Sequence, residues 1–115
     1  MNTPNWIQNL KADPLPWLLE PQDAAVRAVT LRDLLDVPAN DADLLKAEAS
    51  AVENGPVASL LNEMLPDGYW VVEGPGYLPK YRSTVWSFIT LAQLGAKTHW
   101  DQRIVMAGKY ILDHT

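Results

Sequence analysis

The sequence of 115 residues contains no cysteine and only one phenylalanine. Without a thiol, the chain can form neither a disulfide bond nor a thiolate metal site. Nine basic side chains stand against fourteen acidic ones, which gives a net charge of −5 at pH 7. The densest basic cluster is only Lys80 and Arg82. The basic stripe that a nucleic-acid surface requires is therefore missing, and no nucleic-acid partner is expected.

Long hydrophobic runs are also missing. A helix that spans a bilayer needs about 20 consecutive apolar residues, and no stretch of the sequence approaches that length, so no membrane span is expected. The amino terminus, MNTPNWIQNLKADP, lacks the basic start and the apolar run of a signal peptide. These absences predict a cytoplasmic protein. The hydrophobic content of 48% is that of a globular chain, and the length suits a single domain over residues 1–115.

The apolar spacing predicts an all-α chain. Hydrophobic side chains recur at three- and four-residue steps over about 22–36, 41–54, 80–94 and 99–113. Shorter helices are expected over 3–11, in PWLLE and from Pro56 to Pro66, while YWVVEG is expected to be a loop because it has no partner strand. The residues expected to face inward are Ala25, Val26, Val29, Leu31, Leu34, Leu35, Leu44, Leu45, Ala47, Ala51, Val52, Val85, Trp86, Ile89, Leu91, Ala92, Leu94, Ile104, Val105, Gly108, Ile111 and Leu112.

The expected helix ends follow from capping residues. Asn40 or Asp41 can cap the helix over about 41–54. Thr98 can cap the last helix, where Asp101 takes the place of a capping-box acid or a partner of the helix dipole. Gly108 in the middle of that helix costs about 1 kcal/mol relative to alanine, so a close helix crossing is expected there.

An internal repeat is predicted at an offset of sixty residues. Asp41 falls on Asp101, and the helices on either side also align. The other matched pairs are Trp17-Leu18 with Tyr77-Leu78, Thr30-Leu31-x-x-Leu34 with Thr90-Leu91-x-x-Leu94, Leu44-Leu45 with Ile104-Val105, Ala47 with Ala107, and Ala51-Val52 with Ile111-Leu112. The units span about 17–76 and 77–115, the second incomplete. Two amphipathic helical pairs that match by chance are the alternative interpretation.

The incomplete second unit has a predicted consequence. A helical repeat needs neighbours to cover its apolar face, and terminal repeats normally carry a polar cap. The helix over about 99–113 shows no such cap. The chain is therefore expected to be the front part of a longer repeat array, or to complete its core by self-association.

The segment LLNEMLPDGYW resembles the helical repeats of the squalene cyclase and protein prenyltransferase group, the α/α-toroid terpenoid cyclases. In that group an apolar helix is followed by glutamine, three residues, glycine, one residue and tryptophan. Gly68 and Trp70 match this motif, and Met64 stands at the glutamine position. The stretches KYRSTVWSFITLAQLG and YILDH are also similar, so the resemblance covers the chain from Trp17 to its end. It implies antiparallel helical hairpins that form part of an α/α toroid or a related superhelix.

The family's chemistry does not carry over with the fold. Its cyclases use an Asp-x-Asp-Asp motif, whereas Asp41-x-Asp43, the nearest match here, is interpreted as a helix start. Its prenyltransferases hold zinc with an aspartate, a cysteine and a histidine, and this chain has no cysteine. The resemblance therefore implies a non-catalytic domain with no cofactor, whose chemistry would lie beyond Thr115. The alternative is a HEAT-like protein–protein interaction module, since VRAVTLRDLL with its following helix also fits such a pair.

Four aromatic residues are the predicted binding residues: Trp70, Tyr77, Tyr81 and Trp86. In a toroid, aromatic faces can line a central cavity and stabilise cations. The possible partners of the chain are a protein or an apolar small-molecule ligand. In the alternative interpretation Trp70 fills the turn of the repeat and Trp86 belongs to the core.

No metal site or catalytic residue is predicted. His99 and His114 are fifteen residues apart, which is too far along one helix for joint coordination. His99 with Asp101 supplies two ligands, and a closed zinc site needs four. Lys80 and Arg82 are expected at a helix start, where they could contact an anion or bridge to Glu73 or Asp67.

Overall fold

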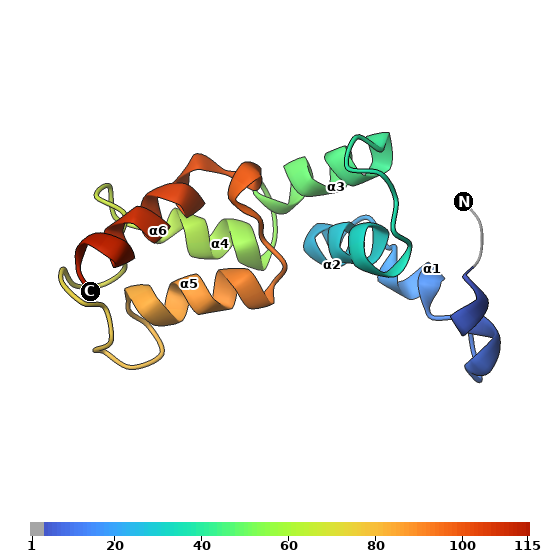
Figure 1. Ribbon diagram of the computed structural model, residues 1–115, viewed down its shortest axis with the longest axis horizontal. Coiled ribbons are helices and arrows are strands. Elements are labelled where there is room, and N and C mark those ends of the chain that lie inside the picture. Colours follow the sequence, from blue (N-terminus) through green and yellow to red (C-terminus); the bar gives the residue numbers. More distant parts are fainter. Residues whose placement is uncertain (1–3) are drawn as a thin grey trace.

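The computed structural model describes residues 4–115 (Figure 1). Within that range every regular element is a helix and none is a strand, so the predicted all-α class is confirmed. The segment YWVVEG forms a loop, as expected. The elements in chain order are η1 (Asn5–Asn9), α1 (Leu15–Leu18), α2 (Ala24–Val29), η2 (Thr30–Leu34), α3 (Ala42–Ala51), α4 (Pro56–Asn62), α5 (Thr84–Gln93), η3 (Thr98–Trp100) and α6 (Gln102–Asp113).

The molecule is elongated and has two lobes. Its principal extents are 49 × 27 × 23 Å, and its radius of gyration is 16.2 Å, against about 13 Å for a compact chain of this length. The N-terminal lobe runs from η1 to α3, and the C-terminal lobe contains α4, α5, η3 and α6. In the view of Figure 1, α2 and α5 lie below α3 and α6. None of the helices in residues 4–115 has the length and hydropathy needed to cross a bilayer.

The N-terminal lobe is built on the helical hairpin of α2 and α3. Ala28 and Leu31 are fully buried in a core that also contains Leu44 and Ala47 of α3. The Asp41 carboxylate accepts a hydrogen bond of 3.1 Å from the backbone N–H of Leu44, as expected for the N-cap of α3. These small and branched side chains allow the two helices to pack closely along the whole hairpin.

The first helix of this hairpin ends in a π turn. The backbone N–H of Leu35 donates to the carbonyl of Thr30, five residues earlier, so η2 is π-helical. Sixty residues later the helix ends differently. The N–H of Leu94 donates to the carbonyl of Thr90, four residues earlier, and the N–H of Gly95, which matches Leu35, donates to the carbonyl of Ala92, three residues earlier. The apolar spacing gave no sign of this difference, since both helices carry the same Thr-Leu-x-x-Leu pattern.

The C-terminal lobe packs α4, α5 and α6 around Trp70. The Trp70 side chain is buried together with Leu61, Leu91 and Ile104. Asp101, and not Thr98, caps α6, because its carboxylate accepts a hydrogen bond of 2.8 Å from the backbone N–H of Arg103. Thr98 begins the short 3-10 helix η3 instead.

The start predicted for α5 was four residues too early. The helix begins at Thr84, so Lys80 and Arg82 lie in the turn before it. Tyr81 has a φ of 71°, in the left-handed region, which a right-handed helix cannot include. Among residues 4–115 neither Lys80 nor Arg82 forms an ion pair within 4.0 Å, so the suggested bridge to Glu73 or Asp67 is absent there.

The helices bury a narrower face than the apolar spacing predicts. Each is covered on one side only, so its outer apolar positions have nothing to pack against. The inner face of α6 is made by Ile104, Ala107 and Tyr110. A Cβ at Gly108 would meet the Phe88 ring at 3.5 Å, an ordinary contact, so the crossing of α5 and α6 does not require glycine. Residues expected to face inward but exposed are Val26, Leu34, Leu45, Ile89, Ala92, Val105 and Leu112.

Positions sixty residues apart have similar environments in the two lobes. Asp41 and Asp101 both cap a helix with their carboxylates. Thr30 and Thr90 both donate a side-chain hydrogen bond to the carbonyl four residues earlier. Three matched pairs of core positions are buried in both lobes: Leu31 with Leu91, Leu44 with Ile104, and Ala47 with Ala107.

Gly95 brings the lobes into contact. Its φ of 86° lies in the left-handed region, and a Cβ at this position would overlap the Val29 side chain of α2. The Gly95 carbonyl also accepts a hydrogen bond of 3.1 Å from the Arg32 guanidinium. Only glycine combines this backbone conformation with so close an approach.

Candidate functional site

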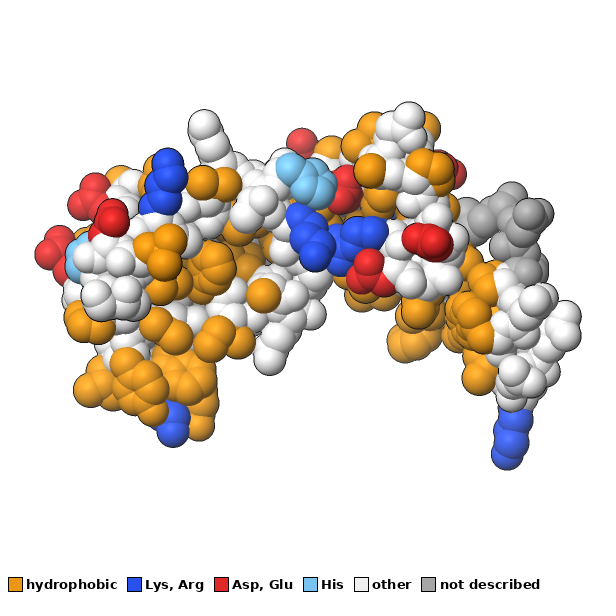
Figure 2. All heavy atoms as spheres, viewed as in Figure 1, with side chains coloured by type: hydrophobic (Ala, Val, Ile, Leu, Met, Phe, Trp, Pro, Cys, Tyr) orange, Lys and Arg blue, Asp and Glu red, His pale blue; other side chains and the backbone are white. Residues whose placement is uncertain are grey.

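Three of the four predicted aromatic residues form one cluster, at the loop before α5 and its first turn. The ring centroids of Tyr77 and Tyr81 lie 5.4 and 4.9 Å from that of Trp86. The indole N–H of Trp86 donates to the Tyr77 carbonyl at 2.9 Å. Rings at this separation pack against one another, so they do not enclose a cation between them. Figure 2 shows hydrophobic side chains gathered at this end of the molecule.

An internal cation already lies at the edge of this aromatic cluster. The Lys80 Nζ is 5.0 Å from the centroid of the Tyr81 ring, within range of a cation–π interaction. Tyr77 and Tyr81 are nevertheless exposed. The cluster is therefore partly open to solvent, and the Lys80 ammonium lies over the Tyr81 ring.

Trp70 is apart from this cluster and is buried in the core. Its indole N–H donates to the Leu60 carbonyl of α4 at 2.9 Å, and its backbone N–H donates to the Thr84 hydroxyl of α5 at 3.0 Å. The turn that carries Trp70 is thereby fixed to both helices. Trp70 is buried, and its indole N–H has a hydrogen-bond acceptor. Both observations agree with the interpretation in which Trp70 fills the turn of the repeat.

A cavity lies beside Trp70 and is called here the Trp70 cavity. Its volume is about 470 Å³. It brings together two of the predicted binding residues, Trp70 and Tyr81, but not Tyr77 or Trp86. Its lining residues are Leu60, Glu63, Trp70, Val71, Tyr81, Arg82, Ser87 and Thr90.

A second hollow runs between the lobes, beside α2, and is called here the α2 groove. Its volume is about 390 Å³. Most of its lining is apolar, and Val26 and Leu34 on its wall are 47% and 44% exposed. The residues that line it are Leu18, Gln22, Asp23, Ala24, Ala25, Val26, Val29, Thr30, Leu34, Asn54, Gly55, Pro56, Gln93 and Leu94.

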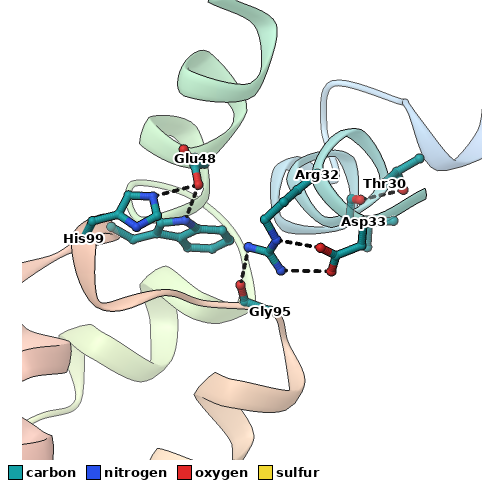
Figure 3. A network of polar contacts seen from close by, with 8 residues as sticks. Thr30, Arg32, Asp33, Glu48, Gly95 and His99 are labelled. Carbon is teal, nitrogen blue, oxygen red and sulfur yellow. Dashed lines mark hydrogen bonds and ion pairs between the residues drawn. The ribbon is translucent and has the colours of Figure 1, made fainter. Parts of the chain in front are cut away.

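Two sets of polar contacts join the lobes (Figure 3). The buried Glu48 carboxylate of α3 accepts hydrogen bonds from the indole N–H of Trp100 at 2.6 Å and from the His99 ring at 2.9 Å. The Arg32 guanidinium bonds to the Gly95 carbonyl and to the Asp33 carboxylate. These contacts join α3 to η3, and η2 to the turn after α5, which are distant in the sequence.

Comparisons with known proteins give no relative for this chain. No family model, no curated protein and no solved structure matches it.

The clearest electrostatic pair stabilises the start of α6. Hydrogen bonds from the Arg103 side chain to Asp101, at 2.9 and 3.0 Å, lower the pKa of the Asp101 carboxyl and raise the pKa of the Arg103 guanidinium. The Arg32 guanidinium likewise lowers the pKa of Asp33 through its hydrogen bonds. Both pairs are structural: each joins close neighbours in the chain and lines neither the Trp70 cavity nor the α2 groove.

The histidines do not gather with acids into a metal cluster. In residues 4–115 no group of three histidine, aspartate or glutamate side chains is placed to hold a metal ion. His99 bonds to Glu48, and His114 bonds to the Tyr110 carbonyl and stacks on the Tyr110 ring, with centroids 3.9 Å apart. Both histidines therefore have structural partners.

The sequence interpretation overlooked Glu48, Trp100 and Tyr110, which form polar contacts between distant parts of the chain. The Tyr110 hydroxyl accepts a hydrogen bond of 2.8 Å from the backbone N–H of Gly74. A signal for Glu48 was available. It lies four residues after Leu44 and three before Ala51, on the inward face of its helix, and a carboxylate at such a position needs a buried partner.

Proposed function

We propose that this chain is a non-catalytic helical-repeat domain that binds an amphipathic helix of a partner protein in the α2 groove. One observation carries the proposal: an apolar groove of about 390 Å³ lies between two lobes, and aliphatic side chains on its wall are left exposed. Contiguous exposed apolar surface on a small domain marks an interaction site.

The shape of the groove favours a helix as its occupant. Val26, Val29 and Leu34 follow one another along a single helix, and Leu18 and Leu94 lie at the borders of the groove. A wall of this kind accepts side chains from one face of a second helix, at steps of three and four residues. The bound helix would bury the apolar side chains of Val26 and Leu34, which the rest of the chain leaves exposed.

Charge favours a basic partner. The chain carries a net charge of −5, and Asp23 lies on the lining of the groove. Basic side chains that flank the apolar face of the partner helix would be attracted by Asp23 and by the net negative charge of the chain, which raises the association rate and helps to fix the orientation. An acidic helix with the same apolar face would be disfavoured.

A second candidate is the one implied by the resemblance, a non-catalytic part of a longer terpenoid cyclase-like or prenyltransferase-like toroid. The shared caps and buried positions of the two hairpins favour it, because stacked repeats place equivalent residues in equivalent environments. In that arrangement α2 and α5 would be inner helices, and the α2 groove would take an apolar small molecule.

Binding of designed peptides tests the first candidate. The probes are three labelled peptides: a basic amphipathic helix of leucine and lysine, an acidic counterpart of leucine and glutamate, and a scrambled basic peptide with no apolar face. Fluorescence anisotropy should show that the basic helix binds most tightly. The double variant Val26→Ser, Leu34→Ser should weaken this binding by about tenfold or more, as expected for removed anchor residues.

Leu45→Ser is the matched control, because Leu45 is 50% exposed on α3 and does not line the groove. It should leave peptide binding unchanged. Equal binding of the scrambled peptide, or an equal loss in the Leu45 variant, would contradict the proposal. Farnesol is the probe for the second candidate: saturable quenching of tryptophan fluorescence by farnesol, abolished by the groove variants, would favour the toroid.

A further inference from the structure

The Trp70 cavity lies on the C-terminal lobe, away from the α2 groove, and the proposed helix binding does not use it. Leu60 of α4 and Trp70 give it apolar walls, and Val71 and Tyr81 come from the loop between α4 and α5. A volume of about 470 Å³ lies within the range of small-molecule sites in proteins, about 300–1,000 Å³.

Two opposite charges line this cavity. Glu63 and Arg82 both belong to its lining, and both are exposed. Within the described part of the chain neither forms an ion pair within 4.0 Å. The other three arginines each lie within that distance of an acid: Arg27 of Asp43, Arg32 of Asp33, and Arg103 of Asp101. Arg82 therefore differs from every other arginine in the sequence.

Both charges also oppose the dipole of the helix beside them. Glu63 is the C-cap of α4, where the helix dipole places partial negative charge. Arg82 directly precedes Ser83, the N-cap of α5, where the dipole places partial positive charge. A cationic group at Glu63 and an anionic group at Arg82 would each relieve this repulsion.

The backbone around the cavity is held in an unusual conformation. Val71 has a φ of 68° and Tyr81 a φ of 71°, both in the left-handed region, and a branched residue such as valine rarely adopts it. The hydrogen bonds of Trp70 to Leu60 and Thr84 anchor the loop next to Val71. Strained residues held by their surroundings are typical of sites that position a ligand.

We propose that the Trp70 cavity binds a small zwitterion with an apolar body, a free amino acid or a short peptide. The ligand carboxylate would pair with the planar Arg82 guanidinium, which suits bidentate binding. Its ammonium group would pair with Glu63, and its apolar side chain would lie against Leu60, Trp70 and Tyr81. This site is independent of the helix-binding proposal.

A set of leucine derivatives tests the assignment of each charge. The probes are L-leucine, the dipeptide Leu-Leu, N-acetyl-leucine, which has no ammonium group, and leucine amide, which has no carboxylate. Binding is measured from amide chemical shifts of the intact chain in NMR titrations. At least one of the two zwitterions should bind and shift the amides of Trp70 and Tyr81. Each singly charged derivative should bind about tenfold more weakly, or worse, since a charged hydrogen bond has been lost.

Two variants give the decisive pattern. Arg82→Gln should weaken N-acetyl-leucine but leave leucine amide unchanged, and Glu63→Gln should do the reverse. Both residues are exposed, so the fold should persist, which is checked by circular dichroism. Glu53→Gln, an exposed acid outside the cavity, is the control and should change nothing.

Two results would overturn the proposal: no shift of the cavity amides by either zwitterion, or binding that is insensitive to both charge variants. The double variant Val26→Ser, Leu34→Ser should leave zwitterion binding intact. Failure of the peptide experiment and failure of this one are therefore separate outcomes.

Discussion

The two lobes use the same hairpin in different ways. Each pairs a helix with Thr-Leu-x-x-Leu to a helix capped by aspartate. In the C-terminal lobe, Tyr77 from the preceding segment packs on Trp86 of α5. In the N-terminal lobe, the matching residues Trp17 and Val26 are 68% and 47% exposed.

The difference teaches where hollows form on the surface of this molecule. In the C-terminal lobe, the long loop between α4 and α5 packs Tyr77 and Tyr81 against α5 and forms part of the lining of the Trp70 cavity. In the described residues 4–115, the short helices η1 and α1 precede the N-terminal hairpin instead, and the outer face of α2 stays open as a groove. The segment that precedes each hairpin therefore decides whether an aromatic side chain packs on the outer face of its first helix.

The largest expected effect is on the stability of the C-terminal lobe. Trp70→Ala removes its central side chain and should cost about 3–5 kcal/mol, the usual range for a buried tryptophan. Native-state hydrogen exchange should show lost protection in α4, α5 and α6, with α2 and α3 largely retaining theirs. Trp70→Phe is the control: it keeps most of the volume and loses the bond to the Leu60 carbonyl, at about 1 kcal/mol. Equal loss of protection in both lobes would show that they do not unfold separately.

The junction between the lobes should respond next. Glu48→Ala leaves the buried indole N–H of Trp100 without its acceptor, so the free energy of unfolding should fall by about 1–3 kcal/mol in urea denaturation. Glu48→Ala in a Trp100→Phe background should cost less, because the orphaned donor is gone. Purely additive losses in this double-mutant cycle would mean that the two side chains are not coupled.

The smallest effects should come from the two matched caps. Asp41→Ala and Asp101→Ala should each cost about 1 kcal/mol, and Asp101→Ala the more, because that carboxylate also holds the Arg103 side chain. Thermal unfolding of the two variants at neutral pH makes the comparison. Equal losses would mean that the bond to the Arg103 side chain adds nothing to the cap.

The Asp101 cap should also depend on pH. The pKa of Asp101 is lowered, chiefly by the hydrogen bond from the Arg103 side chain. Its contribution is therefore present above the unfolded-state value of about 3.9 and is lost as the pH falls through the lower folded-state value. Asp101→Asn should flatten the acid limb of the stability curve. An unchanged acid limb in this variant would contradict the assignment.

Local signals predicted much of the fold. The apolar spacing predicted the helices. Asp41, one of the two expected caps, does cap α3, and YWVVEG is the loop that the missing partner strand predicted. These features depend on residues that are near one another in the chain. The helix start near residue 80 was wrong because it depends on the backbone conformation of Tyr81, which side-chain patterns do not report.

The sites were harder to predict because they depend on distant contacts. Glu48 and Trp100 lie fifty-two residues apart, and nothing in either segment points to the other. Of the four aromatic residues singled out, Trp70 and Tyr81 line one cavity, but its charges come from Glu63 and Arg82. The open face of α2 was mistaken for core, since an apolar stripe looks the same whether a neighbour covers it or not.

Because of the π turn at the end of the first hairpin helix, the two hairpins divide the same number of residues differently between helix and connection. Thr30 and Asp41 are as far apart in the sequence as Thr90 and Asp101, yet the first helix takes one more residue into its last turn. The connection to the aspartate-capped helix is shorter by that residue, since it spans 35–41 before α3 and 94–101, with η3 inside it, before α6. A π turn of this kind changes the direction in which the chain leaves the helix, while the number of residues between Thr30 and Asp41 stays the same as between Thr90 and Asp101. Two hairpins with the same spacing between matched residues thereby send the chain out of the first helix in different directions.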